Sequence, residues 1–176
     1  MDTVGICFGR YNPPHKGHKE SWKIAAQYDH FFIGTNPNTI GPNDPLPFDV
    51  KLKAMETISP DIAEHIMPEQ NLFTLATKIY EKFGEHIQLK VCTDEEWLSK
   101  SLEKYNGVES THGYFKFDSI IQEKTPRLSS ATALREAVQN GNKELFSEAA
   151  GISADTEINI NNRVFKFFDL VGEFVS

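Results

Sequence analysis

The chain has 176 residues and a formal net charge of -7, with 39% hydrophobic and 11% aromatic residues. This length fits one domain with a substantial core, and the composition argues against a disordered chain. The negative charge argues against non-specific binding to nucleic acid or to an anionic membrane, because both reward an excess of Lys and Arg. We therefore expect any anionic ligand to be held locally, by a few cations and by backbone N–H groups.

No apolar run approaches the roughly 20 residues that span a membrane, and the N-terminus lacks the basic and apolar regions of a secretion signal. Cys7 and Cys92 each lie in an apolar, strand-like run. This setting favours buried free thiols in a reducing compartment over a disulfide or a metal pair. These features predict a cytoplasmic protein.

Strand-like and helix-like segments alternate from the N-terminus. Val4–Phe8 predicts a strand, Lys16–Tyr28 an amphipathic helix and His30–Thr35 a second strand. Residues 36–47 are dense in Pro, Asn and Gly, which predicts a long loop. A helix is predicted next, over residues 48–58.

The second half of the chain continues this alternation. The predicted elements are a helix at 71–84, a strand at 86–93, a helix at 94–107, a strand at 113–123, helices at 129–141 and 143–150, and a last helix at 161–171. Such alternation is typical of a parallel sheet with helices on both faces. We expect an α/β, Rossmann-like doubly wound fold in a single domain, 1–176, with 151–176 an unassigned tail packed on the body.

The first candidate motif is GRYNPPHKGH, residues 9–18, directly after the first predicted strand. His15 and His18 are three residues apart at a helix start, so both can face one ligand where orphan N–H groups favour an anion. Gly17 removes a side chain, which would let a base or a ribose lie against the backbone. The alternatives are a surface HxxH without a role and half of a metal site, although the other histidines lack matching spacing.

The second candidate motif is SSATALR, residues 129–135, at the start of a late predicted helix. Ser129, Ser130 and Thr132 place hydroxyls at the helix N-terminus. Arg135 lies one turn further on, and its planar guanidinium suits phosphate. The alternative is an ordinary helix cap followed by a solvated arginine.

Together the two motifs resemble those of a known superfamily. GRYNPPHKGH is similar to the HxGH signature of the nucleotidyltransferases with a Rossmann-like HIGH fold, and LSSATALR is similar to their ISSTxxR motif. NDPLPFDVKLKAM and SLEKYNG resemble segments of nucleotidyltransferase-like proteins of large tailed bacteriophages. The resemblance extends to about Ala150, and for a phage protein it implies the host cytoplasm.

The resemblance implies transfer of a nucleoside monophosphate from a nucleoside triphosphate to a small phosphate-bearing acceptor, with Mg²⁺ held largely by the substrate phosphates. It implies catalytic roles for His15, His18 and Arg135. The nucleotide-binding residues that it implies are Gly9, Arg10, Tyr11, Lys16, Gly17, Ser129, Ser130 and Thr132. Two departures from the family pattern are Ala131 in place of a second serine and VCTDEEW at the end of the fourth strand.

The acceptor is the least defined part of the expected site. Trp97 could stack on nicotinamide, with a packing role as its alternative. Lys51 and Lys53 could add cations, with a solvated helix face as the alternative for each. The resemblance favours a nicotinamide-mononucleotide adenylyltransferase, followed by a cytidylyltransferase acting on a phosphoalcohol or sugar phosphate. A nucleotide-binding protein without turnover is the alternative of another class, and assembly into a homo-oligomer is left open.

Overall fold

The computed structural model describes residues 1–175. Contacts between Cα atoms divide the chain into two compact units, each built from three segments. Unit 1 comprises Met1–Gly9, Glu20–Asn36 and His65–Pro126, and unit 2 comprises Arg10–Lys19, Pro37–Glu64 and Arg127–Ser176. The expectation of a single domain over the whole chain stays a prediction.

Unit 1 is built on a five-stranded sheet in which every pairing is parallel. The strands are β1 (Asp2–Phe8), β2 (His30–Thr35), β3 (Ile66–Pro68), β4 (Ile87–Thr93) and β5 (Ser119–Lys124), in the order β3-β2-β1-β4-β5. In the register of the central strand, Ile6 pairs with Phe32 on one side and Val91 on the other. This is the Rossmann-like α/β topology that the sequence predicted.

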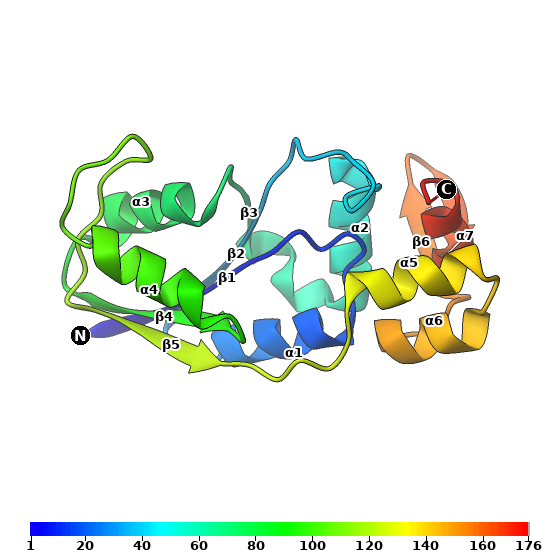
Figure 1. The fold of residues 1–176 in the computed structure, drawn as a ribbon, viewed down its shortest axis with the longest axis horizontal. Helices are drawn as coiled ribbons and strands as arrows, with labels where there is room; N and C mark the ends of the chain where they lie inside the picture. Colours follow the sequence, from blue (N-terminus) through cyan, green and yellow to red (C-terminus); the bar gives the residue numbers. More distant parts are fainter. Residues whose placement is uncertain (176) are drawn as a thin grey trace. The chain divides into compact units, whose positions relative to one another are not determined.

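Helices cover both faces of this sheet (Figure 1). They are α1 (Lys16–Ala25, from Glu20 in this unit), α3 (Leu72–Phe83) and α4 (Glu96–Tyr105). Val4 and Ile6 of β1 join the buried cluster that contains Leu75 of α3. Gly5 points to the opposite face, where an added Cβ would lie 2.7 Å from the carbonyl oxygen of Ala25. The alternation along β1 therefore places α3 and α1 on opposite faces.

The predicted strand at 113–123 is wrong in its first half, because β5 begins only at Ser119. The side chain of Asn106 accepts a hydrogen bond from the Phe117 N–H at 2.8 Å and donates one to the Phe117 carbonyl at 3.0 Å. Both backbone groups of Phe117 are therefore occupied before the ladder starts. Phe115 and Phe117 are buried all the same, which explains the strand-like alternation in the sequence.

Unit 2 is mainly helical. Its elements are the start of α1, α2 (Phe48–Ile58), most of the 3₁₀ helix η1 (Pro60–His65), α5 (Ala131–Gln139), α6 (Lys143–Ala150), the antiparallel hairpin of β6 (Glu157–Ile160) and β7 (Arg163–Lys166), and α7 (Phe167–Gly172). The rings of Phe146 in α6 and Phe167 in α7 meet edge to face, with their centroids 5.0 Å apart.

The predicted last helix at 161–171 is wrong in its first half, where the chain forms the hairpin. Asn161 and Asn162 both have positive φ, 52° and 68°. Asn tolerates this left-handed region, and two such residues in a row make a tight hairpin turn. Helix α7 starts only at Phe167.

Two further observations bear on the sequence predictions. Cys7 and Cys92 are buried and free. Within residues 1–175, no helix has both the length and the apolar character that crossing a membrane requires.

Candidate functional site

The segment between β1 and α1 has an unusual backbone. Tyr11 is 3% exposed and has φ 50°, a left-handed conformation that is rare for an aromatic residue. The Asn12–Pro13 peptide bond is cis. The rings of Tyr11 and His18 are nearly perpendicular in a T-shaped contact, with their centroids 4.6 Å apart. A positive φ at a bulky residue such as Tyr11 is strained, and residues of this kind cluster at functional sites, which makes this segment a candidate.

The two histidines hold each other in one orientation. Their rings stack, with centroids 3.6 Å apart and an interplanar angle of 29°. The His18 Nδ1 atom accepts a hydrogen bond from the His15 N–H at 3.1 Å, and the His15 Nδ1 atom accepts one from the Gly17 N–H at 3.0 Å. Because each Nδ1 is an acceptor, each neutral ring carries its proton on Nε2. The site therefore presents two imidazole donors of defined tautomer.

Both imidazoles are neutral at pH 7. Burial, together with the positive charges of Arg127 and Lys16, lowers the pKa of His15 to about 4. Burial also lowers the pKa of His18 well below its usual value, and His15 adds to this effect. A neutral pair can donate hydrogen bonds to a phosphate without first gaining a proton.

The missing side chain of Gly17 has a local explanation. A Cβ added at Gly17 would lie 2.9 Å from Cε1 of the His15 ring and 3.5 Å from the backbone nitrogen of Leu128. Glycine is thus needed so that His15 can fold back over the start of α1 and accept the Gly17 N–H. The expected contact between Gly17 and a base stays a prediction.

The second motif forms the start of α5. Ser130 is the N-cap, and its Oγ accepts a hydrogen bond from the Ala133 N–H at 3.1 Å. Thr132 Oγ1 accepts one from Arg135 Nη2 at 3.2 Å. Ser129, which is half-buried, directly precedes the cap. The capping role and the reach of Arg135 back toward the helix start are therefore both present, as the spacing indicated.

The two motifs meet at Arg135. Its Nη1 atom donates to the Asn12 carbonyl at 3.0 Å and to the Asn43 carbonyl at 3.3 Å. Asn12, which is 1% exposed, accepts the Leu46 N–H at 2.7 Å and donates to the Leu46 carbonyl at 3.3 Å. Hydrogen bonds therefore tie together the histidine segment, the loop before α2 and the start of α5, all within unit 2.

A cluster of positive charge surrounds this junction. The charges of Arg10 and Asp44 both act on Arg135, and Asp44 also acts on Lys51. Lys51 is 2% exposed, and burial lowers its pKa to about 8 while Asp44 opposes that shift. Lys16, at the start of α1, lies against Gly151 at the C-cap of α6. Four cations of this acidic chain, Arg10, Lys16, Lys51 and Arg135, therefore make up a cationic cluster in unit 2, where we expect anionic ligands.

The two lysines of α2 differ in their surroundings. The Lys53 side chain is 51% exposed and lies 3.7 Å from the Glu56 carboxylate. The solvated helix face considered for both residues therefore fits Lys53, whereas it is wrong for the buried Lys51.

Two of the predicted site residues lie in unit 1. The Gly9 N–H donates to the Gly34 carbonyl at 3.2 Å, which extends the pairing of β1 with β2. Trp97 lies on α4 and is 62% exposed, so packing in a core does not explain it. Its expected role in acceptor binding stays a prediction.

The sequence reasoning missed three residues of this site. Asn12 and Asp44 act through partners that are distant in the sequence, and no local pattern marks them. Arg127 precedes the second motif by two residues, and its charge acts on His15. A basic residue so close to a phosphate motif is a signal that could have been used.

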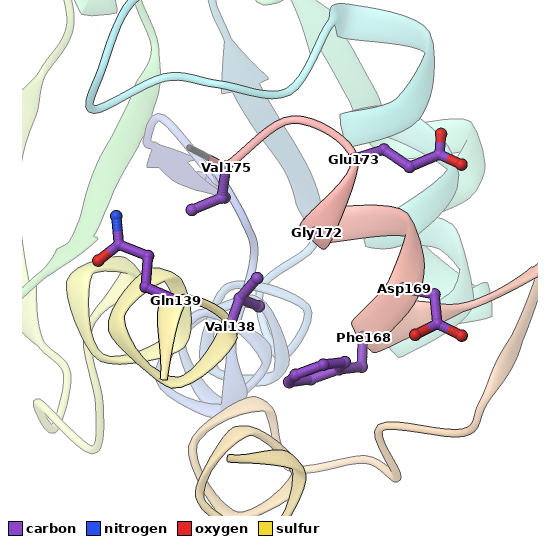
Figure 2. Close-up of a pocket in the computed structure, with 7 residues that line it drawn as sticks. All are labelled: Val138, Gln139, Phe168, Asp169, Gly172, Glu173 and Val175. Atoms are coloured by element: carbon purple, nitrogen blue, oxygen red, sulfur yellow. The ribbon is translucent and has the colours of Figure 1, made fainter. Parts of the chain in front are cut away.

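A cavity of about 630 Å³ lies between α5 and α7 (Figure 2). Its lining residues are Val138, Gln139, Phe168, Asp169, Gly172, Glu173 and Val175. None of the predicted site residues lines it. The carboxylates of Asp169 and Glu173 would repel phosphate, so this cavity does not compete with the cationic cluster as an anion site.

The arrangement of the His, Cys, Asp and Glu side chains bears on metal binding. Within residues 1–175, no three His, Cys, Asp or Glu side chains gather as a metal-ligand group. The expectation of Mg²⁺ held by the substrate phosphates stays a prediction.

The fold has counterparts among solved structures, although no protein-family model and no curated protein matches the sequence. The structure of this chain matches 25 chains of solved structures. One is the crystal structure of a "putative nicotinate-nucleotide adenylyltransferase" from Vibrio parahaemolyticus, with 14% identity and a TM-score of 0.54, covering 85% of this chain and 94% of that one. At this identity the likeness establishes the Rossmann-like α/β fold.

Proposed function

We propose that this protein is a nucleotidyltransferase that moves a nucleoside monophosphate from a nucleoside triphosphate to a small phosphate-bearing acceptor and releases pyrophosphate. The observation that carries the proposal is the hydrogen bond from Arg135 to the Asn12 carbonyl, because it brings both phosphate-type motifs to one cationic cluster. The fold likeness is consistent with this activity.

The reaction would be a single in-line displacement. An oxygen of the acceptor phosphate attacks the α-phosphorus, the new P–O bond forms, and the bond to the bridging oxygen breaks as pyrophosphate leaves. The attacking oxygen is already ionised near neutral pH, so no general base is required. The protein contributes by positioning the substrates and by stabilising charge that develops in the transition state.

Each part of the cluster has a role in this scheme. The Nε2–H groups of His15 and His18 donate to oxygens of the α- and β-phosphates. Arg135, with Ser130 and Thr132 at the start of α5, holds the β- and γ-phosphates. When bound to the triphosphate, Mg²⁺ supplies further neutralisation of charge.

Arg10, Tyr11 and Lys16 complete the nucleotide side of the proposed site. Arg10 and Lys16 contribute positive charge. Tyr11 orients the His18 ring through the T-shaped contact between their rings. Lys51 would supply a buried cation on the acceptor side. The proposed setting is the cytoplasm, that of the bacterial host if a phage encodes the chain.

ATP with nicotinamide mononucleotide is the proposed substrate pair. The test is pyrophosphate release from each of four nucleoside triphosphates, paired with nicotinamide mononucleotide, nicotinate mononucleotide, phosphopantetheine, glycerol phosphate and choline phosphate. We expect release with ATP and a pyridine mononucleotide. Turnover with CTP alone would eliminate the adenylyl assignment in favour of cytidylyl transfer, and binding without release under any pairing would leave a nucleotide-binding protein.

A further inference from the structure

Asp44 is a buried carboxylate in a site that otherwise favours anions. It lies in the loop between β2 and α2 and is 6% exposed. Its Oδ2 atom lies 3.7 Å from Arg10 Nη1. Its Oδ1 atom is buried and has no hydrogen-bond partner within residues 1–175. A buried carboxylate oxygen without a donor is costly, so its presence requires an explanation.

Hydrogen bonds fix the loop around Asp44 at three neighbouring residues. The backbone groups of Asp44 and Gly41 exchange two hydrogen bonds, at 3.0 and 3.1 Å. The Asn43 carbonyl accepts from Arg135, and both backbone groups of Leu46 bond to the Asn12 side chain. The carboxylate is therefore presented to the cationic cluster by an anchored backbone.

Phosphate binding alone does not account for this residue. Asp44 lies among cations, and its charge acts on Lys51 and Arg135 as well as on Arg10. A negative charge here opposes any phosphate that those cations would hold. A ligand that carries both phosphates and a hydrogen-bond donor would satisfy the cations and the unpartnered oxygen together.

We propose that Asp44 accepts a hydrogen bond from a ribose hydroxyl of the nucleotide whose phosphates are held by Arg10 and Arg135. This inference rests on the proposed function and adds a substrate class to it. The site then favours a nucleotide that carries the contacted hydroxyl over the analogue that lacks it and over polyphosphates without a sugar, because that hydroxyl gives the buried Oδ1 atom its missing donor.

The test is a binding cycle that needs no turnover. Dissociation constants are measured by calorimetry for ATP, 2′-deoxy-ATP, 3′-deoxy-ATP and tripolyphosphate, with the wild-type chain, Asp44→Asn and Asp44→Ala. In the wild type we expect ATP to bind on the order of 10-fold more tightly than at least one deoxy analogue. In Asp44→Ala, which has no acceptor, we expect that difference to shrink to less than about 2-fold. In Asp44→Asn we expect tripolyphosphate to bind more tightly because a like charge is gone.

Glu136→Gln is the matched control. Glu136 is exposed on α5, and its charge also acts on Arg135, so this variant removes one negative charge near the same guanidinium. We expect it to leave the preference for ATP over the deoxy analogue unchanged. Asp44→Ala serves as a second variant. Thermal melts establish whether the variants fold. The comparison of ATP with its analogues in the wild type does not depend on any variant.

Two outcomes would overturn the proposal. One is equal binding of ATP and both deoxy analogues by the wild type. The other is an Asp44→Ala variant that changes the affinities of ATP and tripolyphosphate by the same factor, because Asp44 would then act through its charge alone. If the enzyme releases pyrophosphate but shows no preference for the hydroxyl, the role of Asp44 is rejected and the proposed function stands. If the chain prefers the hydroxyl but releases no pyrophosphate with any acceptor, the role of Asp44 stands and the proposed function is rejected.

Discussion

The guanidinium of Arg135 donates a hydrogen bond to the carbonyl oxygen of Asn12 at 3.0 Å, across 123 positions of sequence. The same Nη1 atom reaches the Asn43 carbonyl, and Nη2 reaches the Thr132 hydroxyl. Arg135 thus has two functions in one side chain. It joins three segments of unit 2, and it places a permanent positive charge against the backbone of the histidine motif at Asn12.

Replacing Arg135 with Lys should separate these two functions. Lysine keeps the charge, but a single ammonium cannot reproduce the fork that reaches two carbonyls and a hydroxyl. We expect Arg135→Lys to weaken tripolyphosphate binding by roughly 10-fold and to lower the melting temperature, as followed by calorimetry and circular dichroism. Wild-type affinity in Arg135→Lys would contradict the requirement for a planar guanidinium.

Asn12 should control the geometry of the site through Leu46. Asn12→Ala leaves the buried N–H and carbonyl of Leu46 without their partners, so we expect the free energy of unfolding to fall by about 2 kcal/mol. Nucleotide affinity should fall as well, because the loop that carries Asp44 loses its anchor. Urea unfolding and calorimetry measure the two effects.

Asn106→Ala is the matched control for this prediction. Asn106 binds both backbone groups of Phe117 in the same way, but it lies in unit 1. We expect a similar loss of stability with unchanged nucleotide affinity. Equal losses of affinity in both variants would mean that the effect at Asn12 is one of general stability.

Lys51 should give anion binding a pH dependence. Its pKa of about 8 means that it loses its charge as the pH rises through 8, whereas both histidines are already neutral there. We expect the affinity for tripolyphosphate to weaken between pH 7 and 9 in the wild type and in the control Lys143→Met. Because arginine stays charged, a flat profile is expected for Lys51→Arg. A wild-type profile that is flat over this range would exclude a ligand contact with Lys51.

The neutral histidine pair should make the fold sensitive to acid. Because the pKa of His15 falls from 6.5 when unfolded to about 4 when folded, the unfolded chain binds more protons below pH 6.5. With respect to His15, the free energy of unfolding therefore has its full value above pH 6.5 and decreases as the pH falls toward 4. We expect His15 to account for roughly 2 kcal/mol of the loss between pH 7 and 5.

Urea unfolding at these two pH values, compared between the wild type and His15→Gln, measures this contribution. Glutamine has no group that titrates in this range, so the variant should lose less stability on acidification. An identical loss in both proteins would show that His15 is not held neutral by the fold.

Most of the fold follows from local pattern. The bounds of β2, α2 and α6 are those that hydrophobic periodicity and flanking polar residues predicted. Strand β3 was missed because it has only three residues and follows a 3₁₀ helix. The hairpin of β6 and β7 was taken for part of a helix, although Asn161-Asn162 between two alternating runs is a recognisable turn signal.

The site was predictable only in part. Spacing within each motif suggested that His15 and His18 share a face and that Arg135 reaches back over the start of its helix. Asn12 could not be identified in that way, because its role depends on Leu46, 34 residues away in the sequence. The unpartnered oxygen of Asp44 is likewise a property of the folded loop.

The most direct test of the account follows the α-phosphate itself. ATP labelled at the α-phosphorus is incubated with Mg²⁺ and nicotinamide mononucleotide, and the label and pyrophosphate are quantified for the wild type and for His18→Ala. We predict transfer of the label to the acceptor with one pyrophosphate per transfer, and a loss of about 10²-fold or more in His18→Ala with ATP affinity less affected. Wild-type protein that binds ATP but passes no label to this or any other phosphate-bearing acceptor would contradict the account.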